Sequence, residues 1–119
     1  MPRYSLGFDF GTESVRVLVV DIKDGRIAGQ ASHNYAHGVI DVALVTTGEK
    51  LPPDYALQHP QDWLDSLAAA AHAALREARI NPADVIGIGV DFTSCTMLPA
   101  KSDGTPLCLL DEFAKATQP

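Results

Sequence analysis

The sequence predicts an α/β fold with one mixed β-sheet, in the element order β-β-β-α-β-β and with the strand order 3-2-1-4-5. Three observations lead to this prediction. Apolar residues alternate on either side of two tight turns, at residues 11–14 and at Asp24-Gly25, which is typical of antiparallel neighbours. A stretch with helical periodicity then separates these strands from an apolar run at 85–92. Because such a crossover brings the chain back in the same direction, we expect the fourth strand to lie parallel to the first.

The first three strands are predicted over residues 4–10, 15–20 and 26–35. Tyr, Leu, Phe and Phe alternate with smaller or polar residues in the first of them, and the second is rich in valine. Residues 37–55 show no clear periodicity and contain both glycine and proline, so we predict a loop of about twenty residues there. Loops of that length inside a compact domain are often functional.

The helix is predicted over residues 60–79. Pro60 suits a first helical position, and Asp62 suits the first turn, where the partial positive charge of the helix end favours a carboxylate. An apolar stripe follows at helical spacing, made up of Trp63, Leu67, Ala70, Ala71, Ala74, Leu75 and Ala78. Asn81-Pro82 is expected to end the helix, because the residue before a proline disfavours helical backbone angles.

Two further strands are predicted after the helix. Residues 85–92 are apolar enough to be buried on both faces, as in a central parallel strand. Asp91, near the end of that strand, is expected to accept hydrogen bonds from backbone N–H groups and not to be catalytic, since a buried carboxylate needs partners. The fifth strand is predicted over residues 96–100, before a turn at 102–104.

The composition is that of an ordinary globular domain, with 119 residues, 46% hydrophobic and 20% charged. A net charge of −6, with Lys and Arg scattered along the chain, argues against nucleic acid or an anionic membrane as the main partner. No apolar run approaches the roughly 20 residues of a transmembrane helix, and no signal-peptide core is present. Cys95 and Cys108 do not form a disulfide framework, which predicts reduced thiols in a cytosolic protein.

The most informative segment is Gly-Phe-Asp-Phe-Gly-Thr-Glu-Ser at residues 7–14, where the first strand runs into an acidic, hydroxylated turn. Gly11 permits a close backbone approach to an oxyanion, and the hydroxyls of Thr12 and Ser14 can donate hydrogen bonds. Successive N–H groups in such a turn can form an anion-binding nest. Asp9 would repel a bare phosphate, so its predicted role is to hold Mg²⁺ directly or through water. An ordinary hairpin accounts for this octet equally well.

The histidines and Cys95 are not predicted to carry chemistry. His33 and His37 are four residues apart in an extended segment, which separates them by about 13 Å at 3.3 Å per residue, so a metal site is not expected. His59 is expected to be a helix-entry residue and not a ligand. Cys95 lacks an identifiable base partner and is expected to serve as a small packing residue beside a pocket.

An Asp-x-Gly-Thr-x-Ser turn in a βββαβ unit resembles the actin-like ATPase superfamily, which implies a ribonuclease H-like/actin-like fold. Residues 35–41, 56–63 and 87–99 resemble the bacterial L-ribulokinases, a branch of the FGGY carbohydrate kinases. The resemblance covers nearly the whole chain, and the run at 91–99 is its most specific piece. It implies a two-domain enzyme several times longer. Residues 1–119 would then be the N-terminal part of the first, sugar-binding domain, without its remainder and without the second, ATP-binding domain.

The resemblance implies phosphorylation of L-ribulose to L-ribulose 5-phosphate in arabinose catabolism, in the cytoplasm, with ATP and Mg²⁺. It implies that Asp9 positions metal-bound water. The residues that would face the phosphates of ATP are Gly11, Thr12, Glu13 and Ser14. Those that would lie against the ketose are Thr93, Ser94 and Cys95, beyond the end of a parallel strand, where α/β sheets usually bind ligands. The general-base aspartate and the adenosine pocket lie further along in these kinases, beyond Pro119, so the chain alone is expected to be inactive.

Three alternatives remain open from the sequence. The first is another FGGY kinase, acting on xylulose, glycerol or a related polyol. The second is a non-enzymatic nucleotide-binding protein of the actin-like superfamily, against which the run at 93–99 and the long loop argue. The third is a structural piece that binds no ligand. In each case an uncovered sheet edge predicts self-association of the chain.

Overall fold

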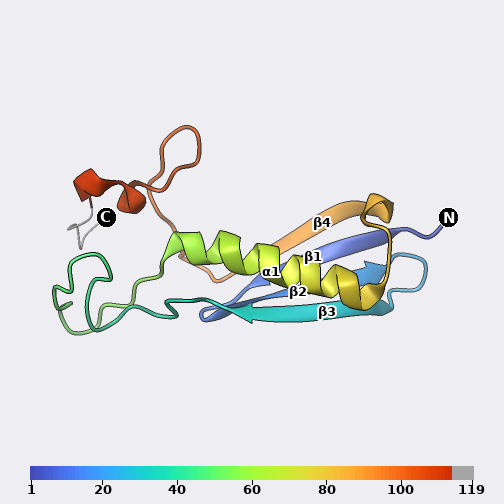
Figure 1. Ribbon diagram of the computed structural model, residues 1–119, viewed down its shortest axis with the longest axis horizontal. Helices are drawn as coiled ribbons and strands as arrows, with labels where there is room; N and C mark the ends of the chain where they lie inside the picture. Colours follow the sequence, from blue (N-terminus) through green and yellow to red (C-terminus); the bar gives the residue numbers. More distant parts are fainter. Residues whose placement is uncertain (114–119) are drawn as a thin grey trace.

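The strands and their order follow the prediction up to the fourth strand. The computed structural model describes residues 1–113, which form one mixed sheet in the order β3-β2-β1-β4 (Figure 1). The strands are β1 (Tyr4–Phe10), β2 (Ser14–Asp21), β3 (Ile27–Asn34) and β4 (Val85–Phe92). β2 runs antiparallel to both β1 and β3, whereas β4 is parallel to β1. The predicted order 3-2-1-4 and the parallel first and fourth strands are therefore confirmed.

The predicted fifth strand is wrong. Of residues 96–100, only Ala100 takes part in a β-bridge, to Pro106, and this bridge is isolated from the sheet. The turn expected at 102–104 is present, with the Gly104 N–H donating to the Lys101 carbonyl over 2.9 Å. This turn reverses the chain at once, and Pro99 and Pro106 have no N–H to donate to a ladder. The segment continues as two short 3₁₀ helices, η2 (Leu107–Leu109) and η3 (Asp111–Phe113).

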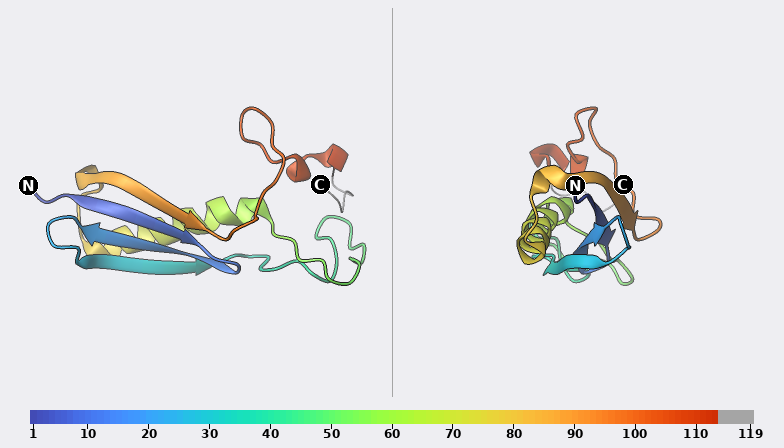
Figure 2. Two further views of the ribbon diagram at one scale, coloured as in Figure 1. Left: turned by 180° about the vertical axis from the view of Figure 1, so that it is seen from behind. Right: turned by 90° about the vertical axis from the view of Figure 1, so that its right-hand side faces the viewer.

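The helix α1 (Pro60–Ala78) begins at the predicted residue and lies across β2 and β3 (Figure 2). Its buried face is turned by about one residue from the predicted stripe. The buried line is Asp62, Ser66, Ala70 and Ala74, while Trp63, Leu67, Ala71 and Leu75 are only partly buried beside it. No helix among residues 1–113 is long and apolar enough to cross a membrane.

The core lies between α1 and the sheet face made mainly by β2. Val15, Val17 and Val19 are fully buried there, and Leu6 of β1 joins them. The helix lies very close to β3 at Gly29. A Cβ at this position would lie 2.6 Å from the Ala74 carbonyl oxygen and 2.7 Å from the Ala78 nitrogen. Small residues on both elements therefore let the helix backbone rest almost directly on the strand.

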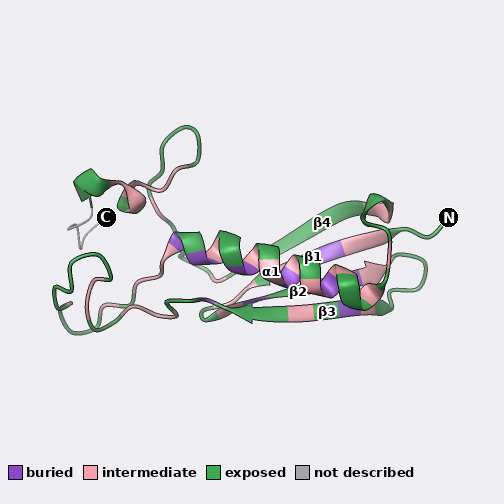
Figure 3. Ribbon diagram, viewed as in Figure 1, coloured by how far each residue is buried: buried purple, intermediate pink, exposed green. Residues whose placement is uncertain are grey.

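β4 is exposed, contrary to the expectation that it is buried on both faces (Figure 3). The register places Ile88, Val90 and Phe92 beside apolar residues of β1, on the same side of the sheet as α1. The helix covers β2 and β3 and does not reach them, so these three side chains remain 56–65% exposed. The apolar composition of β4 is thus real, but no other part of the described chain covers it.

We expect the 119-residue chain to self-associate through β4. Its outer edge and its apolar side chains are uncovered in residues 1–113, and both features favour strand pairing between chains. Light scattering after size-exclusion chromatography should show a dimer or larger species. Val90→Lys should shift the chain to monomer, whereas Val42→Lys, in the exposed loop, should leave the assembly unchanged. A monomeric unsubstituted chain at all concentrations would contradict this prediction.

Candidate functional site

The predicted site residues gather at one end of the sheet. The turn between β1 and β2, the end of β4 and the first turn of α1 all lie at that end (Figure 1). β1 and β4 are parallel neighbours, and Phe10 pairs with Phe92. The residues that follow each strand therefore leave the sheet side by side. Crevices beyond the carboxyl ends of parallel strands are where sheets of this kind usually bind ligands.

The turn at residues 11–14 is closed by its own backbone. The Gly11 N–H donates to the Ser14 carbonyl over 2.8 Å, and a Cβ on Gly11 would lie 3.1 Å from that oxygen. Gly11 is thus needed for the tight closure, and its N–H is not available to a ligand. The N–H groups of Thr12 and Glu13 have no acceptor among the described residues. These two donors are the ones that can bind an anion.

The carbonyl oxygens of Gly11, Thr12 and Glu13 accept hydrogen bonds from Tyr35 and Gln58. The Tyr35 hydroxyl donates to the Gly11 carbonyl over 3.0 Å, and Gln58 Nε2 donates to the Thr12 carbonyl over 2.7 Å. The Tyr35 N–H donates to the Glu13 carbonyl over 2.9 Å. With these acceptors occupied, the turn is fixed, and N–H groups are what it offers to a ligand.

Tyr35 is well suited to this role. Burial raises the pKa of its hydroxyl, and the negative charges of Asp9 and Asp62 raise it further. The hydroxyl therefore stays protonated at neutral pH and can donate its hydrogen bond. Neither Tyr35 nor Gln58 was identified from the sequence, because their contacts with the turn span 24 and 46 residues.

Asp9 lies in a row of charged residues on the sheet face opposite α1. It pairs across the strands with Arg16 of β2 on one side and with Asp91 of β4 on the other. A cavity of about 320 Å³ is lined by Asp9, Arg16 and the turn residues Gly11 and Ser14. A second cavity of about 580 Å³ shares Asp9 and Arg16 and extends to Asp91.

Arg16 is a candidate site residue that the sequence analysis missed. The sequence pattern could have identified it, because side chains alternate between the two faces of a strand. The valines on either side of Arg16 are buried under α1, so Arg16 lies on the opposite face. A carboxylate, a guanidinium and the Ser14 hydroxyl therefore share one cavity, which also borders the turn that carries the free N–H groups of Thr12 and Glu13. This set of groups fits a phosphate together with a divalent cation, for which carboxylate oxygens are preferred ligands.

Asp91 was predicted to accept a backbone hydrogen bond, and it does so from the N–H of Phe92 over 3.0 Å. Its predicted burial is wrong, because β4 is uncovered and Asp91 is exposed. The carboxylate therefore lines the larger cavity.

The predicted sugar-binding residues, Thr93, Ser94 and Cys95, form a turn directly after β4. Ser94 and Cys95 are exposed, and Cys95 has a left-handed backbone with φ of 63°. The Thr93 hydroxyl lies 2.7 Å from the Thr96 hydroxyl. None of the three lines either cavity, so the structure places them beside the Asp9 region without joining the two. Cys95 and Cys108 are both free thiols.

A mixed βββαβ sheet with an acidic, hydroxylated turn after its first strand is the arrangement expected of a sugar-kinase domain. The chain belongs to the FGGY family of carbohydrate kinases, whose N-terminal domain matches residues 4–108. Among curated proteins it is 56% identical over 114 residues to a ribulokinase of Mycolicibacterium smegmatis and 50% identical over 111 residues to a ribulokinase of Geobacillus thermodenitrificans. This confirms the resemblance to ribulokinases described above.

The chain spans about a fifth of the length of these relatives. The two alignments cover 95% and 93% of this chain but 20% of each relative. Among solved structures, a gluconate kinase from Lactobacillus acidophilus matches with a TM-score of 0.68 at 19% identity, over 90% of this chain and 19% of the other. A xyloylose kinase from Brucella ovis matches with a TM-score of 0.67 at 20% identity, over 87% of this chain and 19% of the other. At these identities the likeness shows the fold alone.

Proposed function

We propose that this chain is the N-terminal part of the first, sugar-binding domain of a cytoplasmic L-ribulokinase, which transfers a phosphoryl group from ATP to L-ribulose. The observation that carries this proposal is the 56% identity over 95% of the chain to a protein named ribulokinase. The geometry supports it independently, because the turn at 11–14 has two free N–H donors and its residues Gly11 and Ser14 line one cavity with Asp9.

The turn would serve the phosphate side of the reaction. The N–H groups of Thr12 and Glu13 and the hydroxyls of Thr12 and Ser14 would bind phosphate oxygens, with Gly11 closing the turn behind them. Asp9 would hold Mg²⁺ through water, and the bound ion would neutralise the charge that develops on the phosphates. Catalysis of this kind depends mainly on positioning and on electrostatic stabilisation. The general base that takes the sugar proton is expected beyond Pro119.

The turn after β4 would serve the sugar side. Thr93, Ser94 and Cys95 leave the sheet next to the 11–14 turn, because β1 and β4 are paired up to Phe10 and Phe92. A ketose lying against them would have its reacting hydroxyl directed towards the Asp9 end of the sheet. The exposed Ser94 offers a hydroxyl for such a ligand. An FGGY kinase for another polyol, or a non-enzymatic actin-like protein, would share the fold but would not account for this identity to ribulokinases.

A chimera tests the proposal. In the Mycolicibacterium smegmatis ribulokinase, the segment that matches this chain would be replaced by the matching 114 residues of this chain. We expect the chimera to phosphorylate L-ribulose with ATP and to prefer it over D-xylulose and glycerol. A folded chimera that binds ATP but has lost the transfer to L-ribulose would count against the proposed function.

Changing Ser94 to leucine in that chimera should raise the KM for L-ribulose by about tenfold or more, because added volume excludes a substrate from a shaped pocket. The KM for ATP should stay unchanged. Ser102→Leu, in the exposed turn, is the matched control and should alter neither constant. Steady-state kinetics with each substrate varied in turn would show this. An unchanged KM for sugar would show that Ser94 does not contact the sugar.

A further inference from the structure

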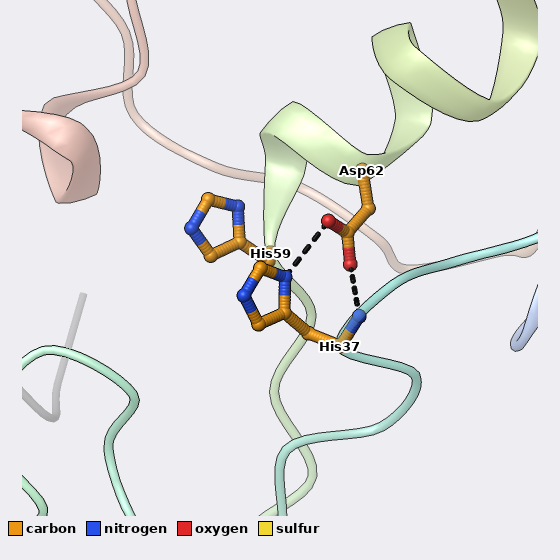
Figure 4. A group of neighbouring side chains, drawn as sticks. All are labelled: His37, His59 and Asp62. Carbon is orange, nitrogen blue, oxygen red and sulfur yellow. Dashed lines mark hydrogen bonds and ion pairs between the residues drawn. The ribbon is translucent and has the colours of Figure 1, made fainter.

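His37, His59 and Asp62 form a cluster where the loop after β3 meets the start of α1 (Figure 4). One nitrogen or oxygen atom from each residue lies within 4.8 Å of the other two. His37 Nδ1 lies 2.8 Å from Asp62 Oδ1, and the His37 backbone N–H donates to Asp62 Oδ2 over 2.9 Å. The two imidazole rings stack with their centroids 4.3 Å apart. Asp62 is 4% exposed, so its carboxylate is directed into the cluster and away from solvent.

His59 contributes an unsatisfied atom to this cluster. Its Nδ1 is buried and has no hydrogen-bond partner. Among the described residues, it is the one buried side-chain nitrogen or oxygen atom that lacks a partner. His59 is also the N-cap residue of α1, yet its side chain makes no capping hydrogen bond. A buried polar atom without a partner costs about 1–3 kcal/mol and calls for an explanation. An imidazole nitrogen beside a second imidazole and a buried carboxylate is a ready metal ligand.

We propose that His37, His59 and Asp62 bind a divalent transition metal ion, with zinc as the preferred ion and water as the fourth ligand. Two imidazole nitrogens and one carboxylate oxygen are a ligand set that suits zinc, whereas magnesium prefers oxygen ligands. The ion would give His59 Nδ1 the partner that it lacks. The site is distinct from the Asp9 centre, whose cavity is lined by a carboxylate, a guanidinium and hydroxyls but no imidazole.

Metal binding requires a small rearrangement. At a metal–nitrogen distance of about 2.0–2.1 Å, tetrahedral ligand atoms lie about 3.3 Å apart. The His59 nitrogen must therefore close in from a separation of up to 4.8 Å, the 2.8 Å pair of His37 Nδ1 and Asp62 Oδ1 must open slightly, and the stacked rings must tilt towards each other. To bind the ion through Nδ1, the neutral His37 imidazole carries its proton on Nε2, so that bonds from both groups to the metal replace the hydrogen bond between His37 Nδ1 and Asp62. The His37 N–H can keep its bond to Asp62 Oδ2, which holds the carboxylate in position for the ion.

The site would fasten both ends of the long loop to the helix. His37 lies near the beginning of that loop and His59 near its end, while Asp62 belongs to the first turn of α1. The partial positive charge of the helix end opposes a cation, and the Asp62 charge offsets it. An ion that binds only the folded chain stabilises the fold in proportion to its concentration and affinity. The role of the metal would therefore be structural.

The experiment uses the 119-residue chain with Cys95→Ser and Cys108→Ser, because exposed free thiols would compete for the metal. Titration calorimetry with Zn²⁺ should show one site per chain, and Zn²⁺ should raise the melting temperature. His59→Phe keeps a stacking ring but removes the nitrogen, and it should weaken binding by more than the roughly 10–100-fold typical of lost outer-shell partners. His72→Phe, on the exposed side of α1, is the matched control and should bind Zn²⁺ normally.

Absence of Zn²⁺ binding to the folded double-serine chain would overturn the proposal. Equal affinity in the His59→Phe variant would do so as well. Nitrogen NMR of the histidine side chains avoids any dependence on how that variant folds. Zn²⁺ should shift Nδ1 of His37 and His59 and leave His33 and His72 unaffected. Shifts confined to other histidines would equally rule out the assigned site.

Discussion

Replacing Asp9 by asparagine in the ribulokinase chimera should lower kcat by about 10²–10³-fold, the range seen when a single group that stabilises transition-state charge is removed. Asparagine keeps the size and one carbonyl oxygen of aspartate but loses the charge that would hold Mg²⁺. Asp9 lies in the cavity beside the 11–14 turn, and none of Thr93, Ser94 and Cys95 lines that cavity. The affinity for L-ribulose should therefore stay nearly unchanged. Steady-state kinetics and sugar titration would measure the two quantities separately.

Asp65→Asn is the matched control for this change. Asp65 is exposed on α1 and accepts a hydrogen bond from Gln61, which asparagine can still accept. Its substitution should leave both turnover and sugar affinity unaltered. If Asp9→Asn instead weakened ketose binding and left turnover normal, Asp9 would belong to the sugar side of the site.

Gly29→Ala should destabilise the 119-residue chain by about 1–3 kcal/mol, the usual cost of forcing extra volume into a packed interior. The added methyl group would meet backbone atoms of α1 at 2.6 and 2.7 Å, and backbone cannot rotate away as a side chain can. The helix must therefore lift off β3, which would weaken its contacts with the buried valines of β2. Denaturation by urea, followed by circular dichroism, would measure the loss.

Gly87→Ala provides the comparison for this prediction. Gly87 is also a strand residue, but a Cβ there would meet nothing within 4 Å. Its substitution should change the free energy of unfolding by no more than about 0.5 kcal/mol, as is usual for surface positions. Equal midpoints for the two alanine variants would show that α1 does not rest on β3 as described.

The parts of the fold that depend on neighbouring residues could be predicted from the sequence. Alternation and the Asp24-Gly25 turn predicted the antiparallel strands, and Gly25 indeed has a positive φ of 77°. Pro60 marked the start of the helix correctly. The burial of β4 could not be predicted, because its composition shows that the strand is apolar but not which element covers it. The fifth strand failed because its apolar residues were weighed more heavily than Pro99.

The same distinction applies to the candidate site. Asp9 and the 11–14 turn are contiguous, so their residue types alone suggested a phosphate and metal centre. The His37–His59–Asp62 cluster was missed, because His37 was compared with its sequence neighbour His33 and its actual partners come after a long loop. No periodicity connects residues on the two sides of such a loop. Arg16 is the exception, since strand alternation alone would have placed it on the same face as Asp9.

The contacts of Tyr35 and Gln58 with the 11–14 turn have a consequence for how such sites are recognised. A search pattern built on the octapeptide at 7–14 would find every hairpin with the same residues. These would include hairpins whose turn carbonyls form hydrogen bonds only with water. The hydrogen bonds that fix the turn come from 24 and 46 residues away. A pattern that also required the tyrosine and the glutamine, at free spacing, would select chains able to hold the turn in its anion-binding shape. A peptide that contains only residues 7–14 would lack these hydrogen bonds and would not keep the turn in that conformation.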